Sequence, residues 1–350
     1  MSEPVLRVIS VGVGGRARAH FRAFTGLPEK FSATALVDIS PDAFTEARQI
    51  TGLPESACFS TLHEALGSVE CDVVGVFTPG HLHTSYMEEA IAAGKHVIVE
   101  KPFTCDLGEA ERVVAAADKQ GVRVLVAQND RFFPMYLQLR EWIAERKYGE
   151  LGAVTMVHHN ARGRPFENGY PPSHLWHQGS HQLDTLLSLV QRPPRRLWGL
   201  TTTPAHSAWP AESHVSAIIE FDGPVVVSYT ATSDAQAYEM YLRIECGEAA
   251  LTLSGFSSNS SDSELRVTPR QPLVRHPRSE VFPQGTPERL PGADGARTGW
   301  AAVEFNIWSN FWDHVVNGTE NETSGANNLQ TMRVLDGIIR STNEGVAIQL

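Results

Sequence analysis

Two hydrophobic periods alternate along the first 130 residues, and this alternation limits the fold more than any other feature of the sequence. Short runs rich in β-branched residues are separated by segments whose apolar residues recur at helical spacing. The runs expected as strands are Leu6–Val11, Ala33–Val37, Val73–Phe77, His96–Val99 and Val122–Ala127, and the expected helices include Pro41–Thr51, Thr84–Ala93 and Gly108–Gln120. Strands that alternate with helices in this way predict βαβ units and a doubly wound parallel sheet.

The pattern changes after Asn129. We expect a helix over Pro134–Arg146, a strand over Ala153–His159 and a helix near His174–Gln191 that ends before Pro193 and Pro194. Four strands then follow without helices between them: Val215–Phe221, Val225–Ala231, Tyr241–Cys246 and Ala250–Leu253. Successive strands joined by short turns indicate an open, largely antiparallel sheet with helices, an α+β domain.

We therefore expect two domains, residues 1–128 and 129–350. Residues 254–299 are rich in Ser, Pro, Gly and Arg and are interpreted as long loops or a frayed edge. Two final helices, about Ala301–Asn317 and Asn327–Asn343, close the chain and could pack back on the first domain.

Composition excludes several classes of protein. Of 350 residues, 42% are hydrophobic and 20% charged, which is globular composition in a chain too long for one usual core. The formal net charge of −11 gives no global field that would draw the chain to nucleic acid or an anionic membrane. No signal-peptide pattern and no run of roughly 18 apolar residues is present. Four scattered cysteines without CxxC spacing indicate reduced thiols, so we expect a cytoplasmic protein.

A glycine-rich turn directly follows the first expected strand and opens a helix. Gly12-Val-Gly14-Gly15-Arg16-Ala17 has the G-x-G-x-x-A form of the dinucleotide-binding fingerprint. Gly12 permits the tight turn, Gly14 lets the backbone approach a pyrophosphate, and Ala17 allows close packing of helix on strand. The N–H groups and dipole at the helix N-terminus favour an anion there. We therefore predict a Rossmann domain that binds a dinucleotide.

Asp38 ends the second expected strand, where the fingerprint places an acid that binds the adenosine ribose. A carboxylate at this position would repel a 2′-phosphate, so NAD is favoured over NADP. Arg16 and Arg18 nearby keep NADP possible. The alternative role for Asp38 is a cap for the helix that starts at Pro41.

Several motifs together resemble the Gfo/Idh/MocA family of NAD(P)-dependent oxidoreductases. They are Gly12–Ala17 followed by His20, Thr78-Pro79-Gly80-His81-Leu82-His83, Glu100-Lys101-Pro102, Asn129-Asp130-Arg131-Phe132, Gly179-Ser180-His181-Gln182-Leu183-Asp184 and the ending from Phe305 to Leu350. The family usually has Asn where this chain has Gly80, and its crossover segment is N-R-R-F. The resemblance covers nearly the whole chain. It implies an enzyme that transfers a hydride between NAD(P) and a hydroxyl or carbonyl group of a sugar, cyclitol or related cyclic substrate.

The resemblance also implies site residues in the first domain. Cofactor contacts are expected from Thr78, Pro79, His83, Glu100 and Lys101, besides the glycine-rich turn. Lys101 corresponds to the family lysine that contacts substrate and nicotinamide. It follows a parallel strand at the edge where doubly wound sheets bind ligands, and desolvation there would help it exchange a proton with a hydroxyl. The alternative is a surface ion pair with Glu100.

The expected helix around His177 carries a polar stripe. At about 100° per residue, His177, His181, Asp184 and Ser188 share one face opposite an apolar arc, so this face meets either water or a cleft. The family pattern here is Asp-x-x-x-His, which makes His181 the expected general base and puts His177 in place of the Asp. Neutral imidazole orients a hydroxyl without supplying charge, and a protonated His177 would suit an anionic substrate. Capping or filling space are the alternatives for His177.

Five further residues are candidate substrate contacts. Arg131 lies in the crossover segment, Arg162 and Arg164 could hold a carboxylate, and Tyr170 and Trp176 could stack on a ring. The alternatives are solvated arginines and aromatic side chains packed in the core. His174, His177 and His181 have spacing compatible with a metal, but the HExxH general base is missing and the family needs no metal, so we expect none.

Three alternative functions remain open. One is a hemiacetal (lactol) dehydrogenase on a carboxylated substrate, because His-x-x-x-His resembles that branch of the family. The others are a glycosidase or lyase that recycles bound NAD, and a non-catalytic NAD-binding sensor. The resemblance further implies a homo-oligomer, a dimer or tetramer, formed through the open face of the second-domain sheet. The expected partner is otherwise a small-molecule substrate.

Overall fold

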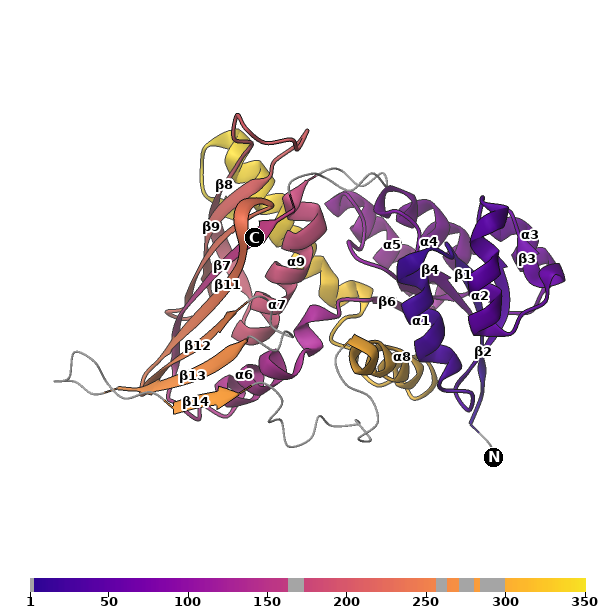
Figure 1. Ribbon diagram of the computed structural model, residues 1–350, viewed down its shortest axis with the longest axis horizontal. Coiled ribbons are helices and arrows are strands. Elements are labelled where there is room, and N and C mark those ends of the chain that lie inside the picture. The colour runs from indigo at the N-terminus through magenta and orange to yellow at the C-terminus, as the bar shows by residue number, and fades with distance from the viewer. Residues whose placement is uncertain (1–2, 163–172, 256–262, 271–279, 284–299) are drawn as a thin grey trace. The chain divides into compact units, whose positions relative to one another are not determined.

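The computed structural model describes residues 3–162, 173–255, 263–270, 280–283 and 300–350 (Figure 1). The chain forms two compact units. Unit 1 consists of Met1–Asn129 and Ala293–Met332, and unit 2 consists of Asp130–Gly292 and Arg333–Leu350. The segment Ala293–Met332 belongs to unit 1, so unit 1 includes residues from the later part of the chain as well as from its beginning.

Unit 1 is built on a six-stranded sheet in the order β3-β2-β1-β4-β5-β6, and every strand pair in it is parallel. Its strands are β1 Leu6–Val11, β2 Phe31–Val37, β3 Cys58–Phe59, β4 Val73–Val76, β5 His96–Val99 and β6 Val124–Val126. The strand order reverses between β1 and β4, which is the switch point where doubly wound sheets bind ligands. The predicted parallel sheet is confirmed.

Helices connect these strands. They are α1 Gly15–Thr25, α2 Phe44–Thr51, α3 Leu62–Ser68, α4 His83–Ala92 and α5 Leu107–Gln120, with 3-10 turns η1 Pro41–Ala43, η2 Glu55–Ala57 and η3 Gly80–Leu82, and α8 Trp300–Val316 joins them from the far end of the chain. Local sequence sets their ends. The Asp106 side chain accepts a hydrogen bond from the N–H of Glu109 at the start of α5, and Gly121 ends α5 in the left-handed region.

The core of unit 1 contains a residue from its last helix. Trp308 of α8 is fully buried, and its ring packs 4.8 Å from that of Phe24 and 5.0 Å from that of Phe31. All four residues of β4 are buried as well. Residues from both ends of the chain therefore complete one hydrophobic core.

Unit 2 contains a nine-stranded sheet in the order β14-β13-β12-β11-β7-β10-β9-β8-β15. Its strands are β7 Leu151–Ala161, β8 Pro194–Thr202, β9 His214–Phe221, β10 Val226–Thr232, β11 Asp234–Cys246, β12 Ala249–Gly255, β13 Glu264–Pro269, β14 Glu280–Pro283 and β15 Ile348–Gln349. The pairs are antiparallel except β7 with β10, which is parallel. The largely antiparallel sheet is confirmed.

Two features of unit 2 go beyond the sequence interpretation. The region 254–299 contains the strands β13 and β14 at the sheet edge, and the rest of that region beyond Gly255 lies mostly outside the described residues. The strand β8 begins at Pro194, which we interpreted only as the end of a helix. Proline can be the first residue of a strand, because that residue need not donate a backbone hydrogen bond to the neighbouring strand.

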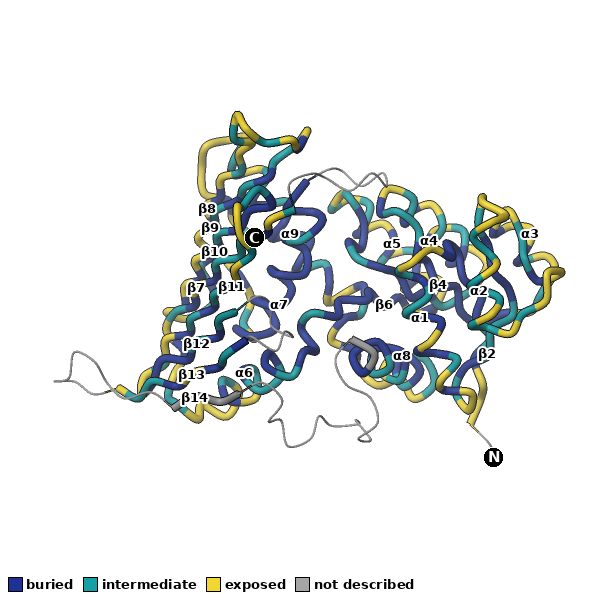
Figure 2. The backbone as a smooth tube through the Cα atoms, in the orientation of Figure 1, coloured by how far each residue is buried: buried dark blue, intermediate teal, exposed yellow. Residues whose placement is uncertain are grey.

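Helices of unit 2 lie along one face of the large sheet (Figure 1). They are the 3-10 turn η4 Asp130–Phe132, α6 Pro134–Ala144, the π-helix η5 Leu175–Gly179, α7 Ser180–Val190 and the second half of α9 Gly325–Glu344. All eleven residues of α7 are buried, and Figure 2 shows this helix in dark blue. A helix buried on all sides must satisfy its polar side chains inside the protein.

Candidate functional site

The glycine-rich turn of unit 1 has the geometry that a diphosphate needs. Gly12 has φ +82°, and a Cβ on it would lie 2.8 Å from the carbonyl carbon and oxygen of Phe77. Gly14 and Gly15 are exposed, and a Cβ on either would meet nothing within 4 Å. The helix α1 begins without a side-chain cap on its first N–H groups. These residues fit a dinucleotide, because the uncapped N–H groups and open backbone can accept an anion.

Asp38 lies beside this turn. Its Oδ2 accepts a hydrogen bond from the N–H of Val13 at 3.0 Å, and its Oδ1 accepts one from the N–H of Ser40 at 2.9 Å. The carboxylate therefore joins the end of β2 to the glycine-rich turn, and each oxygen retains acceptor capacity for a further donor. This is the position that the sequence predicted for a ribose contact, and Asp38 does not accept from the N–H groups of the helix that follows Pro41.

The two arginines that flank the turn both contact carboxylates. Arg16, the second residue of α1, forms ion pairs with Glu100 and with Glu304 of α8. Arg18 pairs with Glu46 of α2. A guanidinium already matched to a carboxylate is poorly suited to neutralise a 2′-phosphate as well.

Glu100 is the buried centre of a polar network in unit 1. Its side chain accepts hydrogen bonds from Arg16 Nε (2.5 Å), His20 Nε2 (2.7 Å) and the backbone N–H of Lys101 (3.1 Å). Trp308 Nε1 donates to His20 Nδ1, so Nε2 of this ring is the nitrogen that carries the proton donated to Glu100. Burial alone would raise the pKa of Glu100, but the Arg16 charge and the His20 bond hold it well below its ordinary value.

His83 links the ends of two strands rather than presenting a polar group at the surface. The ring is fully buried, with Nε2 2.9 Å from the Thr78 carbonyl oxygen and Nδ1 2.8 Å from that of Pro102. Burial lowers the pKa of this histidine. In either neutral tautomer the ring donates to one of the two carbonyl oxygens and only contacts the other. Through these carbonyls it connects the Thr78-Pro79 turn after β4 to the turn after β5.

Lys101 lies in that second turn, immediately after β5 and Glu100, and is half-buried. Its N–H is held by the Glu100 carboxylate, and the peptide bond that joins it to Pro102 is cis. The backbone of the expected catalytic lysine is therefore fixed by Glu100 on one side and, through Pro102, by His83 on the other.

In unit 2, the expected histidine helix begins as a π-helix. The turn η5 contains Trp176 and His177, and α7 continues from Ser180. Side chains advance fewer degrees per residue in a π-helix, so the regular stripe predicted at α-helical spacing does not extend through His177. His177 is 8% exposed and its Nδ1 lies 3.1 Å from Gln178 Nε2. All of α7 and most of η5 are buried, which excludes the alternative that this stripe faces water.

His181 and Asp184 each contact one residue of η4. The Nδ1 atom of His181 lies 4.0 Å from Oδ1 of Asp130, with side-chain exposures of 8% and 28%. Arg131, the next residue of η4, donates from Nε to Oδ2 of Asp184 at 2.7 Å and from Nη2 to Oδ1 at 3.1 Å. Arg131 thus forms a bidentate ion pair within unit 2, with both side chains nearly inaccessible to solvent.

Polar side chains of β7, of β11 and of the residue before η5 make further contacts in unit 2. The rings of His158 and Tyr238 meet edge to face at 5.5 Å, and His174 Nδ1 lies 2.8 Å from Ser233 Oγ. Burial lowers the pKa of His158 to about 4 and that of His174 to about 3, so both rings are neutral at neutral pH. Burial raises the pKa of Tyr238, Asp130 raises it further, and Arg162 opposes them. Asp130 and Arg162 are therefore both close enough to Tyr238 to influence its charge.

Of the remaining predicted substrate contacts, two are described by the structure and two are not. Arg162 is half-buried, and burial lowers its pKa. Trp176 is 8% exposed, in agreement with the packing alternative. Arg164 and Tyr170 lie outside the described residues. Within the described ranges, no group of three or more His, Cys, Asp or Glu side chains is placed to hold a metal ion, and no helix is long and apolar enough to span a membrane.

Sequence reasoning missed Asp130 and Tyr238 as members of this group. Asp130 could have been noticed, because it is a carboxylate directly before Arg131 in a segment otherwise rich in aromatic residues. No sequence pattern indicated that Tyr238 belongs to this group. The register of β11 against β7 shifts between Asp234 and Glu239, and such a bulge breaks the alternation that assigns side chains to faces.

Comparison with known proteins gives two family matches. Residues 6–128 match the model described as "Oxidoreductase family, NAD-binding Rossmann fold" (GFO_IDH_MocA), and residues 136–252 match the GFO/IDH/MocA C-terminal domain. Together the two matched ranges cover more than half of the chain.

Individual relatives match over shorter stretches. The inositol 2-dehydrogenase of Paracoccus denitrificans is 31% identical over 187 residues, which are 53% of this chain and 54% of that protein. The scyllo-inositol 2-dehydrogenase (NADP(+)) of Bacillus subtilis is 31% identical over 146 residues, 40% of each chain. The chain spans about half, or less, of the length of the curated relatives it matches. A levoglucosan dehydrogenase, solved with NADH and levoglucosan, has the same fold, with TM-score 0.84, 20% identity and 99% of both chains covered.

The depressed pKa of Glu100 predicts a pH-dependent contribution to stability. The network stabilises the ionised carboxylate, so its contribution is complete above the unfolded-state pKa of about 4.3 and is lost as pH falls through the lower folded-state value. Glu100→Gln should lower the free energy of unfolding by roughly 2 kcal/mol at pH 7. The difference from wild type should shrink below about pH 4. Urea unfolding at several pH values checks this, and a difference independent of pH would contradict an ionised Glu100.

The Arg131–Asp184 pair predicts strong coupling. Arg131→Met or Asp184→Leu leaves one buried charge without its partner and should lower the free energy of unfolding by about 3–5 kcal/mol. The double variant Arg131→Met/Asp184→Leu should lose much less than the sum of the two single losses. Urea unfolding measures all three. Arg340→Met, which removes an exposed pair with Glu344, is the control and should cost at most about 1 kcal/mol. Additive single effects would contradict the coupling.

Proposed function

Because this chain belongs to the GFO/IDH/MocA oxidoreductase family, we propose that it is an NAD(P)-dependent dehydrogenase or reductase acting on CH–OH groups. The proposed substrate is a sugar, a cyclitol or a related cyclic compound. The observation that carries this proposal is His181, a buried imidazole whose Nδ1 lies at ion-pair distance from a carboxylate. That arrangement suits a group that accepts a proton and becomes charged. The named cyclitol dehydrogenases among the relatives support it.

NAD is the proposed cofactor, with NADP the less suitable one. Gly14 and Gly15 would receive the diphosphate on the N-terminus of α1, and Asp38 would accept hydrogen bonds from the adenosine ribose. Arg16 and Arg18, the two residues that could favour NADP, contact Glu100, Glu304 and Glu46. When bound, the nicotinamide would supply the hydride acceptor or donor.

The chain's own residues would manage the substrate proton. His181 is proposed as the general base that takes the proton of the reacting hydroxyl, and Lys101 as a hydrogen-bond donor to the substrate. His177 would orient the substrate without adding charge in its neutral form. Glu100 and His83 act only through Lys101, because they hold the turn on which it lies.

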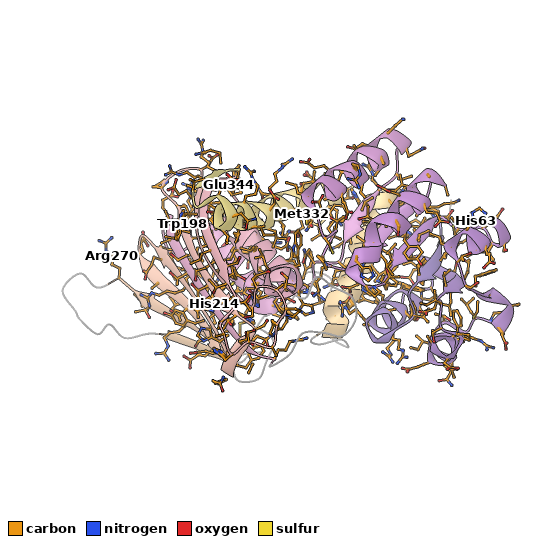
Figure 3. The ribbon with its side chains drawn as sticks, turned by 90° about the horizontal axis from the view of Figure 1, so that it is seen from above. His63, Trp198, His214, Arg270, Met332 and Glu344 are labelled. Carbon is orange, nitrogen blue, oxygen red and sulfur yellow. The ribbon has the colours of Figure 1, made fainter. Side chains whose placement is uncertain are left out.

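Removal of either proposed proton-handling group predicts a selective loss. His181→Asn and Lys101→Met should lower turnover by about 10²–10⁴-fold and lower NAD affinity far less. A thermal-shift screen first compares stabilisation by NAD and by NADP. With the better cofactor present, it then tests sugars, cyclitols and carboxylated lactols, whose carboxylate Arg162 could bind. NADH absorbance then measures turnover. The matched control is His63→Asn, an exposed histidine of α3 labelled in Figure 3.

Three outcomes would contradict this proposal. Equal losses in NAD affinity and turnover would remove the proton-handling roles. Product that accumulates without net NADH would favour a glycosidase or lyase that recycles its cofactor. Tight NAD binding without hydride transfer to any tested substrate would favour a sensor.

We further propose that the protein is a cytoplasmic homo-oligomer, a dimer or tetramer, that pairs through the sheet of unit 2. Large apolar side chains are exposed on β8, β9 and β10: Trp198 (49%), Leu200 (44%), Ile218 (49%) and Val226 (39%). Trp198, labelled in Figure 3, is the direct cross-strand neighbour of Ile218. Grouped apolar side chains of this kind are typical of interfaces. The four cysteines are free, which supports a reducing compartment.

A charge on this sheet face should separate the subunits. Trp198→Glu or Ile218→Lys places a desolvated charge in the proposed interface, which we expect to lower the measured molar mass to that of one chain. Light scattering after size exclusion gives the mass. Val5→Glu is the control, because Val5 is similarly exposed (42%) but belongs to unit 1 and not to the sheet of unit 2. A wild-type mass of a single chain would contradict the proposal.

A further inference from the structure

Two consecutive residues of η4 contact two residues of α7 that lie three positions apart. Asp130 is at ion-pair distance from His181, and Arg131 binds Asp184 with two hydrogen bonds to its carboxylate and one to its backbone oxygen. The buried Arg131–Asp184 pair holds η4 against α7. It therefore also fixes where the carboxylate of Asp130 lies relative to the imidazole.

Both positions depart from the family pattern. The segment Asn129–Phe132 has Asp130 where N-R-R-F has an arginine, and His177 stands where Asp-x-x-x-His has its aspartate. The chain has thus lost a carboxylate on the helix and gained one on η4. We propose that Asp130 is the positioning carboxylate of His181 and replaces the missing family aspartate. This inference rests on the proposed role of His181 as general base.

The distance determines how Asp130 acts. At 4.0 Å the two atoms are too far apart for a hydrogen bond, so the interaction is Coulombic. Both side chains are largely removed from water, which weakens screening. A carboxylate on the Nδ1 side favours the tautomer with its proton on Nδ1 and leaves the lone pair on Nε2. The substrate hydroxyl proton would pass to Nε2, and Asp130 would stabilise the imidazolium that forms.

The other ionisable groups described near Asp130 and His181 do not supply the negative charge that Asp130 supplies. Asp184 is matched by Arg131, and His177 has a polar contact with Gln178. The phenol of Tyr238 stays neutral near neutral pH, because its pKa is raised. Arg162 acts on Tyr238, and a positive charge near an imidazole would oppose its protonation rather than favour it. Among the described residues of these elements, Asp130 is the carboxylate at ion-pair distance from His181.

The decisive experiment is an NMR titration of His181 in the protein without substrate or cofactor. Asp130→Asn keeps the side-chain shape and removes the charge, and we expect the His181 titration midpoint to move to lower pH by about 1 unit. Asp130→Glu should keep the midpoint near the wild-type value. Glu141→Gln, an exposed carboxylate on α6, is the charge-matched control. A His181→Asn variant identifies the signal.

Kinetics test the same claim where turnover is measurable. Asp130→Asn should lower kcat about 10-fold or more with little change in KM, and Asp130→Glu should recover most of it. In the double variant Asp130→Asn/His177→Asp, a carboxylate returns to the family position, and both midpoint and kcat should recover.

The outcomes separate the two proposals. An unchanged midpoint in Asp130→Asn would overturn the positioning role, whatever reaction the protein catalyses. A shifted midpoint without any dehydrogenase activity would uphold the pairing and overturn the proposed function. No recovery in the double variant would overturn the equivalence of Asp130 with the family aspartate.

Discussion

Each unit of this protein keeps an ionised carboxylate in its interior, and the groups that neutralise that charge hold the elements of the proposed site. Removing a carboxylate from water is costly unless cations and hydrogen-bond donors surround it. Glu100 meets this condition through Arg16, His20 and the N–H of Lys101. Asp184 meets it through Arg131. The backbone of Lys101 and the helix that carries His181 are therefore placed by electrostatics as much as by apolar packing.

Local chemistry explains what could be read from the sequence. Gly12 is recognisable because only glycine tolerates both the positive φ and the approach to the Phe77 backbone, and this requirement lies within one turn. The strand Leu6–Val11 was predicted with its true limits for a similar reason, since a buried parallel strand is a continuous apolar run bounded by a turn. Asp38 was identifiable from its place after the second strand.

Long-range and irregular features were not accessible in this way. The α-helical period fails at the π-helix Leu175–Gly179, so the face on which His177 lies could not be read from a uniform 100° step. The ion pair of Arg131 with Asp184 joins residues 53 positions apart in the sequence, and no local sequence pattern predicts it. The substrate contact expected of Arg131 stays a prediction, and its guanidinium contacts Asp184. The same long-range contact brings Asp130 to His181, so the carboxylate missing from the helix became visible only in the folded chain.

Asp38 has one more consequence. Its two oxygens are held by the N–H groups of Val13 and Ser40, so its rotamer is set during folding and not by a ligand. A side chain that is already fixed has little conformational entropy left to lose on association. The adenosine end of the proposed site is therefore preorganised, and a dinucleotide would meet a rigid anchor there before any rearrangement elsewhere in the chain.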